Sequence, residues 1–334
     1  MKLVWKILIV IIVAVLLLSA ATVFYVKSQL SKPAGKDKTV ILEVKQGESV
    51  SDILADLKSK EIVSQTWVLQ IYLAYKGKIR NIKAGTYEVS GSQTIKEIAE
   101  ILGEGKEKIY KITIPEGFTL NQIAEKFEKS GLFSAEDFKK EAIAGNFEYN
   151  FLKKFSKEAS LEGYLFPDTY YFKPKTTPKA AIVKILDNFE KKTKDLQTAA
   201  KGNGKNFEDI IVMASILEKE VRVPKDMALV AGILEKRIAI GQALQVDSTI
   251  NYITGKSEAA VSGPDLEIQS LYNTYKNKGL PPGPISNPGL AVIKAALSSQ
   301  KSDYLYYLSR QDTGETIFSK TYQEHLEAKQ KYLK

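Results

Sequence analysis

The sequence contains no cysteine and a single histidine, His325. The absence of cysteine excludes disulfides, thiol nucleophiles, thiolate-bound zinc and a lipid-modified cysteine anchor. A histidine metal site or a Ser-His-Asp triad would have to rest on His325 alone. That residue lies in an amphipathic run, Tyr322–Leu333, where a packing or surface histidine is the ordinary interpretation. We therefore expect neither a metal ion nor a cofactor.

Arginine is also scarce. The 48 basic residues give a formal net charge of +9, but the arginines among them are Arg80, Arg222, Arg237 and Arg310. Because recognition of phosphates and bases favours the forked guanidinium group, the charge indicates a lysine-rich surface facing an anionic cell envelope and no nucleic-acid partner. At 334 residues, with 44% hydrophobic and 26% charged, the chain has the composition of a folded protein with two or three domains.

The N-terminal region contains one long uncharged run, Ile7–Val26, with lysines on both sides. Twenty apolar residues are enough to cross a bilayer. We expect a retained single-pass anchor in the cytoplasmic membrane. The positive residues at the short N-terminal end, Lys2 and Lys6, favour the cytoplasm for residues 1–6, with the bulk of the chain outside. A cleaved signal peptide is the alternative, since Ser19–Ala21 supplies small residues, but the run exceeds the usual signal core. Residues 27–38 are predicted to be a linker.

A segment of the chain recurs after seventy residues: LEVKQGESVSDILADLKSKEIVS begins at Leu42 and ITIPEGFTLNQIAEKFEKSGLFS at Ile112. Each copy predicts a short strand, a glycine turn, a Ser or Thr N-cap and an amphipathic helix of about ten residues. The positions in register are Val44/Ile114, Gly47/Gly117, Ser49/Thr119, Ile53/Ile123, Leu57/Phe127 and Ile62/Leu132.

These repeats define the predicted domains. Ala84–Val89 is strand-like and Thr94–Leu102 is helical, so residues 39–105 are predicted to form one small α+β domain. Residues 106–155 hold the second copy and a connector, and residues 156–334 a mixed α+β domain. Strand-helix units of this size resemble LysM-type modules, which bind N-acetylated glycans. A spacer module without a ligand is the alternative.

The helix predicted over Ile210–Val221, IIVMASILEKEV, carries one carboxylate on its apolar face. Glu220 falls within that face, whereas Glu218, about 200° away, leaves near the polar flank with Ser215. A carboxyl group among apolar side chains has a raised pKa, as a general acid working near neutral pH requires. Glu220 is therefore the candidate acid. The alternative is an edge glutamate that extends to solvent or pairs with Lys219 or Lys225.

Aromatic residues gather in Glu162–Tyr171, EGYLFPDTYY. Aromatic faces with interleaved polar groups are what sugar rings stack on, although a core strand with a turn is the alternative. Further along, Ser248–Ile253 is short and β-rich, and Tyr304–Leu308 is predicted to pair with Thr316–Phe318. The proline and glycine residues of Gly279–Gly289 predict a rigid loop that shapes a cleft.

Together these segments resemble the MltG or YceG-like group, the membrane-anchored endolytic lytic transglycosylases of bacterial cell-wall synthesis. The order and spacing of five motifs, with the anchor and the repeat region, extend the resemblance over nearly the whole chain. The motifs are Ala214–Glu220 (ASILEKE), Glu162–Tyr170 (EGYLFPDTY), Gln245–Thr249 (QVDST), Tyr272–Tyr275 (YNTY) and Gly279–Ile285 (GLPPGPI).

The resemblance implies cleavage of the β-1,4 bond between N-acetylmuramic acid and N-acetylglucosamine within nascent glycan strands, without water, leaving 1,6-anhydro ends. Glu220 is the implied catalytic acid. Implied partners are peptidoglycan strands, the membrane, peptidoglycan synthases (penicillin-binding proteins) and the elongation or division machinery. The implied supporting or substrate-binding residues are Ser215, Glu218, Glu162, Tyr164, Asp168, Tyr170, Gln245, Asp247, Thr249, Tyr272, Asn273, Tyr275, Pro281 and Asn287.

Two other functions fit parts of the same sequence. A non-catalytic scaffold could bind peptidoglycan through the repeats and Glu162–Tyr171 and recruit cell-wall synthases. A hydrolase could use Asp247 as a second carboxylate beside Glu220, because ordinary glycosidases need two. The hydrolase would leave a reducing sugar end in place of an anhydro end.

Overall fold

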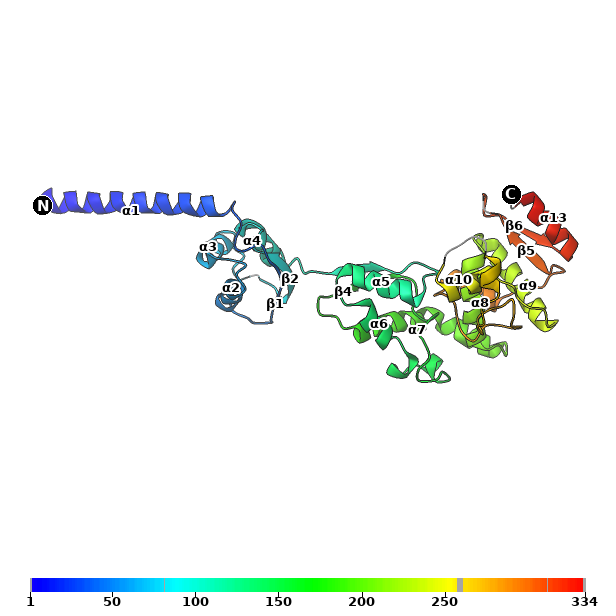
Figure 1. The fold of residues 1–334 in the computed structure, drawn as a ribbon. Helices are drawn as coiled ribbons and strands as arrows, with labels where there is room; N and C mark the ends of the chain where they lie inside the picture. Colours follow the sequence, from blue (N-terminus) through cyan, green and yellow to red (C-terminus); the bar gives the residue numbers. More distant parts are fainter. Residues whose placement is uncertain (1, 81, 257–260, 311, 333–334) are drawn as a thin grey trace. The chain divides into compact units, whose positions relative to one another are not determined.

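The computed structural model describes residues 2–80, 82–256, 261–310 and 312–332 and consists of two compact units, Met1–Tyr110 and Lys111–Lys334 (Figure 1). Met1, the first residue of the predicted segment 1–6, and Lys334, the last residue of the predicted domain 156–334, lie outside the described residues. Both units combine helices with short strands, so the predicted α+β class is confirmed.

The first unit begins with the apolar helix α1 (Lys2–Gln29). Among the described residues it is the one helix long and apolar enough to cross a membrane. The hydroxyl groups of Ser19 and Thr22 donate to the carbonyls four residues earlier, at 2.8 Å each. Polar groups satisfied within the helix in this way are compatible with a bilayer interior. The predicted span Ile7–Val26 thus lies inside one continuous helix.

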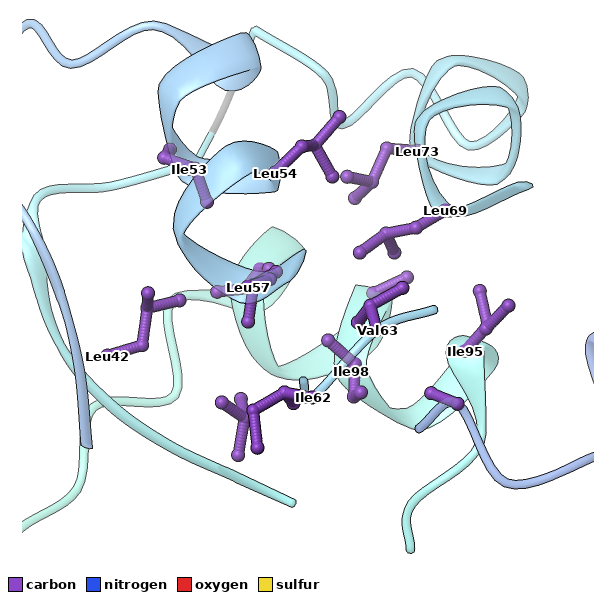
Figure 2. Close-up of a cluster of buried hydrophobic side chains, with 14 of the residues drawn as sticks. Leu42, Ile53, Leu54, Leu57, Ile62, Val63, Leu69, Leu73, Ile95 and Ile98 are labelled. Carbon is purple, nitrogen blue, oxygen red and sulfur yellow. The ribbon is translucent and has the colours of Figure 1, made fainter. Parts of the chain in front are cut away.

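The rest of the first unit is a two-stranded antiparallel sheet packed with three helices. The strands pair from Thr39↔Ser90 to Val44↔Gly85. Figure 2 shows side chains from β1 and all three helices meeting in one core, Leu42, Leu57, Leu69 and Ile98 among them. The elements are β1 (Thr39–Val44), α2 (Val50–Ser59), α3 (Thr66–Tyr75), β2 (Gly85–Ser90) and α4 (Ile95–Glu104).

Both copies of the repeat have the predicted local structure. Gly47 and Gly117 turn the chain with positive φ angles of 80° and 75°, which glycine adopts without strain. Ser49 and Thr119 then cap α2 and α5, each accepting the backbone N–H three residues on. The glycine turns and N-caps predicted for the two copies are therefore confirmed.

The strand partners were not predicted by the repeat. The second copy supplies β3 (Tyr110–Thr113) and α5 (Leu120–Ser130), and β3 pairs with β4 (Thr169–Phe172). Each copy therefore pairs its first strand with a strand that follows later in the chain. As a result, α5 is tied to the Glu162–Tyr171 segment, which runs into β4.

In the second unit, α8 (Phe207–Glu220) packs against α7, α9, α10 and α12. Its residues 210–217 are all buried. The remaining elements are α6 (Ala135–Glu141), 3-10 turns at Ala144–Asn146, Asn150–Leu152 and Pro224–Asp226, α7 (Pro178–Gly202), α9 (Met227–Ala239), α10 (Asp247–Thr254), α11 (Gly263–Leu266), α12 (Leu290–Leu297), β5 (Tyr306–Ser309), β6 (Thr316–Ser319) and α13 (Tyr322–Tyr332).

One predicted strand is wrong. Ser248–Ile253 lies in helix α10, which ends where Gly255 adopts a left-handed conformation with φ +72°. The β-branched residues Thr249 and Ile250 are buried, and this packing overrides their weak preference for strands. The predicted pairing of the last two strands is confirmed, because β5 and β6 run antiparallel from Tyr306↔Ser319 onward.

Candidate active site

Glu220 is the last residue of α8. The following residue, Val221, is extended, with φ −117° and ψ 111°. Pro224 follows shortly after, and a residue that precedes proline is disfavoured in the α conformation. Pro224 thus disfavours continuation of the helix through Val223, and α8 ends at Glu220, whose side chain lies at the C-terminal end of the helix.

The Glu220 carboxyl group is partly buried and accepts two hydrogen bonds. The backbone N–H of Ser248 donates to Oε1 at 3.2 Å, and the Tyr307 hydroxyl donates to Oε2 at 3.4 Å. Ser248 lies in the first turn of α10, where backbone N–H groups have no partner within the helix. The carboxyl group therefore meets the positive end of α10.

Opposing effects act on the pKa of the Glu220 carboxyl. Burial, the largest effect, raises the pKa, and the negative charge of Asp247 raises it as well. The hydrogen bonds from Ser248 and Tyr307 favour the charged form and lower it. The balance is a raised pKa, so the group keeps its proton to higher pH than an ordinary glutamate.

Strand β5 supplies two contacts to Glu220 that the sequence analysis missed. Tyr307 and Ser309 are two positions apart and so share one face of the strand. The Ser309 hydroxyl donates to the Glu220 carbonyl at 2.9 Å. The strand itself was predicted, but no local pattern shows that a residue 87 positions later faces Glu220.

The QVDST and YNTY motifs are brought together beside Glu220. The Tyr275 hydroxyl donates to the Asp247 carboxylate. Behind this pair, the hydroxyls of Thr249 and Thr274 lie 3.0 Å apart, and the Gln245 N–H donates to the Thr274 carbonyl at 3.0 Å. The two motifs therefore form one hydrogen-bonded assembly that fixes Asp247.

Members of this assembly differ in access. Thr249 and Asn273 are fully buried, and Asn273 donates to the carbonyls of Leu266 and Ile268 at 2.9 Å each. These positions suit the supporting role of the two that were predicted for Thr249 and Asn273, supporting or substrate-binding. Gln245 is exposed and has a positive φ of 52°, a conformation that is rare outside glycine and often marks functional sites.

Tyr272 is partly buried and its ring lies 5.2 Å from the ring of Tyr252. Tyr252 lies on α10, and its hydroxyl hydrogen-bonds to Glu162. Tyr272 therefore packs on the helix that supplies Asp247 and Ser248.

Arg237 of α9 is a second feature that the sequence analysis missed. Its buried guanidinium donates to the Leu305 carbonyl through Nε and to the Leu244 carbonyl through Nη1, at 2.7 Å each. Leu305 precedes β5 and Leu244 precedes α10, so one side chain ties together both segments that contact Glu220. An arginine within the mainly apolar run MALVAGILEKRIA was the available signal.

Glu218 and Ser215 do not lie on a polar flank, and that prediction is wrong. Glu218 is partly buried and accepts the Gly289 N–H, at the start of α12, at 2.9 Å. Burial and the nearby charge of Glu116 raise its pKa. Ser215 is fully buried and accepts the Ile285 N–H at 3.0 Å. The prediction failed because α8 is covered around its whole circumference over residues 210–217, directly before Glu218.

Glu162 and Asn287 are buried and hydrogen-bonded to each other, and neither contacts Glu220 in the hydrogen bonds described above. Both Glu162 oxygens accept the Leu120 N–H at 3.0 Å, and the Asn287 amide donates to the same carboxyl at 2.8 Å. The Asn287 carbonyl oxygen accepts the Leu165 N–H at 2.8 Å. Burial raises the pKa of Glu162 to about 7, although the hydrogen bonds oppose this. These contacts hold the fold together, which suits the supporting role of the two that were predicted for Glu162 and Asn287.

The proline- and glycine-rich loop packs inside the unit over much of its length. Pro281 and residues 284–289 are buried. Gly163 has φ +88°, and a Cβ atom there would lie 2.4 Å from Pro284. Residues 284–289 fill the space between α8 and the aromatic segment, while Pro282 is exposed. That the loop shapes a cleft stays a prediction.

Most of the aromatic segment is core and not a sugar-stacking surface, whereas Tyr171 at its end is 53% exposed. Tyr164 is 2% exposed and Tyr170 4% exposed, and the ring of Tyr164 packs 5.2 Å from that of Phe189. Asp168 accepts the Asn188 amide at 3.0 Å, and hydrogen bonds lower its pKa. The alternative interpretation, a core strand with a turn, describes these residues, because the aromatic rings fill the interior between β4 and α7.

This arrangement of side chains suits proton transfer by a carboxyl group. Glu220 is a carboxyl group with a raised pKa, and Asp247 is a neighbouring carboxylate already held by a tyrosine. Within the described residues, no group of three or more histidine or acidic side chains could hold a metal ion.

Comparison with known proteins shows which family the chain resembles. A model of the YceG-like family matches residues 42–331. A curated protein of Bacillus subtilis (strain 168), named endolytic murein transglycosylase, is 34% identical over 329 residues, which cover 93% of this chain and 90% of that protein.

A protein of the same name from Streptococcus pneumoniae serotype 2 (strain D39 / NCTC 7466) is 30% identical over 330 residues. The match covers 90% of this chain but 60% of that longer protein. Among solved structures, a yceG-like protein of Listeria monocytogenes is 33% identical, with a TM-score of 0.58, covering 87% of this chain and 99% of that one.

Proposed function

Because this chain belongs to the YceG-like family, we propose that it is a membrane-anchored endolytic murein transglycosylase. Its curated relatives carry that name at 30 to 34% identity over most of this chain. The observation that carries the proposal is the Glu220 carboxyl group, whose pKa is raised by burial and which sits among Asp247, Ser248 and Tyr307.

The proposed reaction uses Glu220 twice. Protonated Glu220 donates its proton to the glycosidic oxygen as the bond from that oxygen to C1 of N-acetylmuramic acid breaks. The resulting carboxylate then takes the proton of the C6 hydroxyl as O6 bonds to C1. The proton returns to Glu220, no water is consumed, and a 1,6-anhydro end is left. One carboxyl group therefore suffices, and Asp247 acts by tuning it.

Product analysis tests this proposal against its rivals. Purified full-length protein would be incubated with uncross-linked glycan strands, and the masses of the product strands would be determined by mass spectrometry. An anhydro end is lighter by one water molecule than the reducing end that a hydrolase with Asp247 as second carboxylate would leave. Reducing ends would contradict the transglycosylase, and intact strands that remain bound would indicate the non-catalytic scaffold.

We propose a LysM-like role for residues 39–105. The order β1-α2-α3-β2 with an antiparallel strand pair supports this comparison. In the proposed division, residues 106–155 carry the second repeat and a connector, and residues 156–334 the catalytic domain. Removal of residues 39–105 should weaken binding to long glycans while cleavage of short strands persists. Loss of all turnover in a folded truncated protein would show that this region builds part of the active site.

We also propose the topology. Helix α1 would anchor the chain in the cytoplasmic membrane with residues 1–6 in the cytoplasm. Its length supports the anchor, and Lys2 and Lys6 at the N-terminal end support the orientation. Peptidoglycan synthases and the elongation or division machinery are the proposed partners at the membrane. A reporter enzyme that is active only outside the cytoplasm, fused after Lys334, should be active. Activity of a reporter that works only in the cytoplasm would overturn the orientation.

A further inference from the structure

Helix α3 has an unusual outer face for a small soluble module. Its sequence, TWVLQIYLAY, contains no charged residue. Trp67, Ile71 and Tyr75, four positions apart and so on one side of the helix, are 42%, 45% and 81% exposed. The opposite side is already used, because Leu69 and Leu73 point into the core (Figure 2). We call Trp67, Ile71 and Tyr75 the outer face of α3.

This outer face is continuous with the end of α1. The rings of Tyr25 and Trp67 are stacked, with centroids 5.9 Å apart and planes inclined by 6°. The Tyr25 hydroxyl donates to the Gln65 side chain at 3.2 Å, and Val26 and Leu30 pack against the core of the first unit. Tyr25 precedes the last residue of the uncharged run, so Trp67 is held at the level where the proposed span leaves the bilayer.

The composition of the outer face suits a lipid headgroup region. Tryptophan and tyrosine concentrate at membrane interfaces, where the ring is apolar and its edge is polar. Lys76 follows directly, with Nζ 5.7 and 5.9 Å from the ring centroids of Tyr72 and Tyr75. A lysine beside aromatic rings can reach lipid phosphates while its stem covers apolar surface.

We propose that the outer face of α3 lies against the outer surface of the membrane, with Trp67, Ile71 and Tyr75 at the boundary between headgroups and acyl chains. The inference rests on the proposed anchoring by α1. A lipid surface is favoured over a protein partner because the face continues directly into a helix that itself requires lipid around it. The first unit would then be held on the bilayer at two places, by α1 and by α3.

The test uses the two tryptophans of the chain, Trp5 and Trp67. Full-length Trp5→Phe protein in vesicles of phosphatidylcholine and phosphatidylglycerol reports on Trp67 alone. Brominated lipids should quench its emission, more strongly with bromine near the headgroup end of the acyl chain than near the methyl end. Aqueous iodide should quench it weakly, because interfacial helices sit about 5–10 Å into this boundary.

The control proteins separate this surface from the anchor. Trp67→Phe protein reports on Trp5 and so on insertion of α1. Adding Ile71→Ser and Tyr75→Ser to Trp5→Phe should reduce lipid quenching of Trp67, whereas Ile109→Ser, at a residue 52% exposed elsewhere in the unit, should leave it unchanged.

Three outcomes overturn the inference. If lipid quenches Trp5 but iodide, and not lipid, quenches Trp67, the anchor is inserted and the outer face of α3 is not on the membrane. If lipid quenches neither tryptophan, the proposed anchoring fails, and this inference fails with it. Equal lipid quenching of Trp67 with and without Ile71→Ser and Tyr75→Ser would show that α1 alone holds Trp67 near lipid.

Discussion

The hydroxyl group of Tyr307 lies 3.4 Å from Oε2 of Glu220, so a strand near the C-terminus contacts the candidate acid at the end of α8. This hydrogen bond favours the carboxylate, whereas burial favours the protonated form. The pH at which Glu220 loses its proton is thus set by a balance that single substitutions can shift in either direction.

Tyr307→Phe should move the alkaline limb of the pH profile upward. Removing the hydroxyl removes a contact that lowers the Glu220 pKa, so the acid keeps its proton to higher pH. The shift should be less than about one pH unit because the bond is long. The measurement is kcat/KM for glycan cleavage from pH 5 to 9, with Tyr304→Phe as the control. A downward shift would contradict the assignment of Tyr307.

Asp247→Asn should move the same limb downward. The negative charge of Asp247 raises the pKa of Glu220, so neutralising it lets the acid ionise at lower pH. Activity should remain measurable below pH 6, with anhydro products, because Asp247 is not a reacting group in the proposed mechanism. Complete loss of cleavage at every pH in a folded protein would instead support a second essential carboxylate, as in a hydrolase.

What the sequence could predict is mostly local. The repeat was recognisable because a glycine turn, an N-cap and the helix period all lie within about twenty residues of one another. The position of Glu220 on α8 followed from the same period. The long uncharged run of α1 needed no tertiary information at all.

What could not be predicted depends on packing. The helical wheel assumes one covered face, but residues 210–217 of α8 are buried on every side. The wheel therefore placed Ser215 and Glu218 wrongly. Tyr307 and Arg237 reach the site from distant elements, which no spacing in one sequence reveals. The aromatic rings Tyr164 and Tyr170 have the composition of a sugar platform, and only their burial shows that they are core.

Glu162 should make stability fall as pH rises. Its folded pKa of about 7 exceeds the ordinary value of 4.5, so the folded state holds the proton more tightly. The resulting stabilisation is present below about pH 4.5 and is lost as pH rises through about 7, on the order of 3 kcal/mol in all. Glu162→Gln should flatten the unfolding free energy over this window, as measured by denaturant titration of the full chain.

The matched control is Glu158→Gln, at an exposed glutamate in the same unit, which should leave the slope unchanged. Glu220 and Glu218 also have raised pKa values, so the slope in Glu162→Gln should decrease without vanishing. An unchanged slope in Glu162→Gln would show that its carboxyl group ionises normally despite its burial.

The sharpest comparison is between Glu220→Gln and Glu218→Gln. Both acids are on α8 and both have pKa values raised by burial, so environment alone does not separate them. Their contacts do, because Glu218 accepts the N–H at the start of α12 while Glu220 faces Asp247 and Tyr307. Glutamine can still accept the N–H bonded to Glu218, so that substitution should cost little activity.

Glu220→Gln keeps the size of the side chain but removes the proton that the reaction transfers. Formation of anhydro products should fall by about 10²–10⁴-fold, while glycan binding persists. Thermal stability at neutral pH should rise, because the desolvation cost of a partly buried carboxylate disappears. Product yield by mass spectrometry and melting temperature in the same detergent measure both effects. Full activity in Glu220→Gln with loss in Glu218→Gln would identify the other glutamate as the acid, and normal activity in both would exclude a single acid on α8.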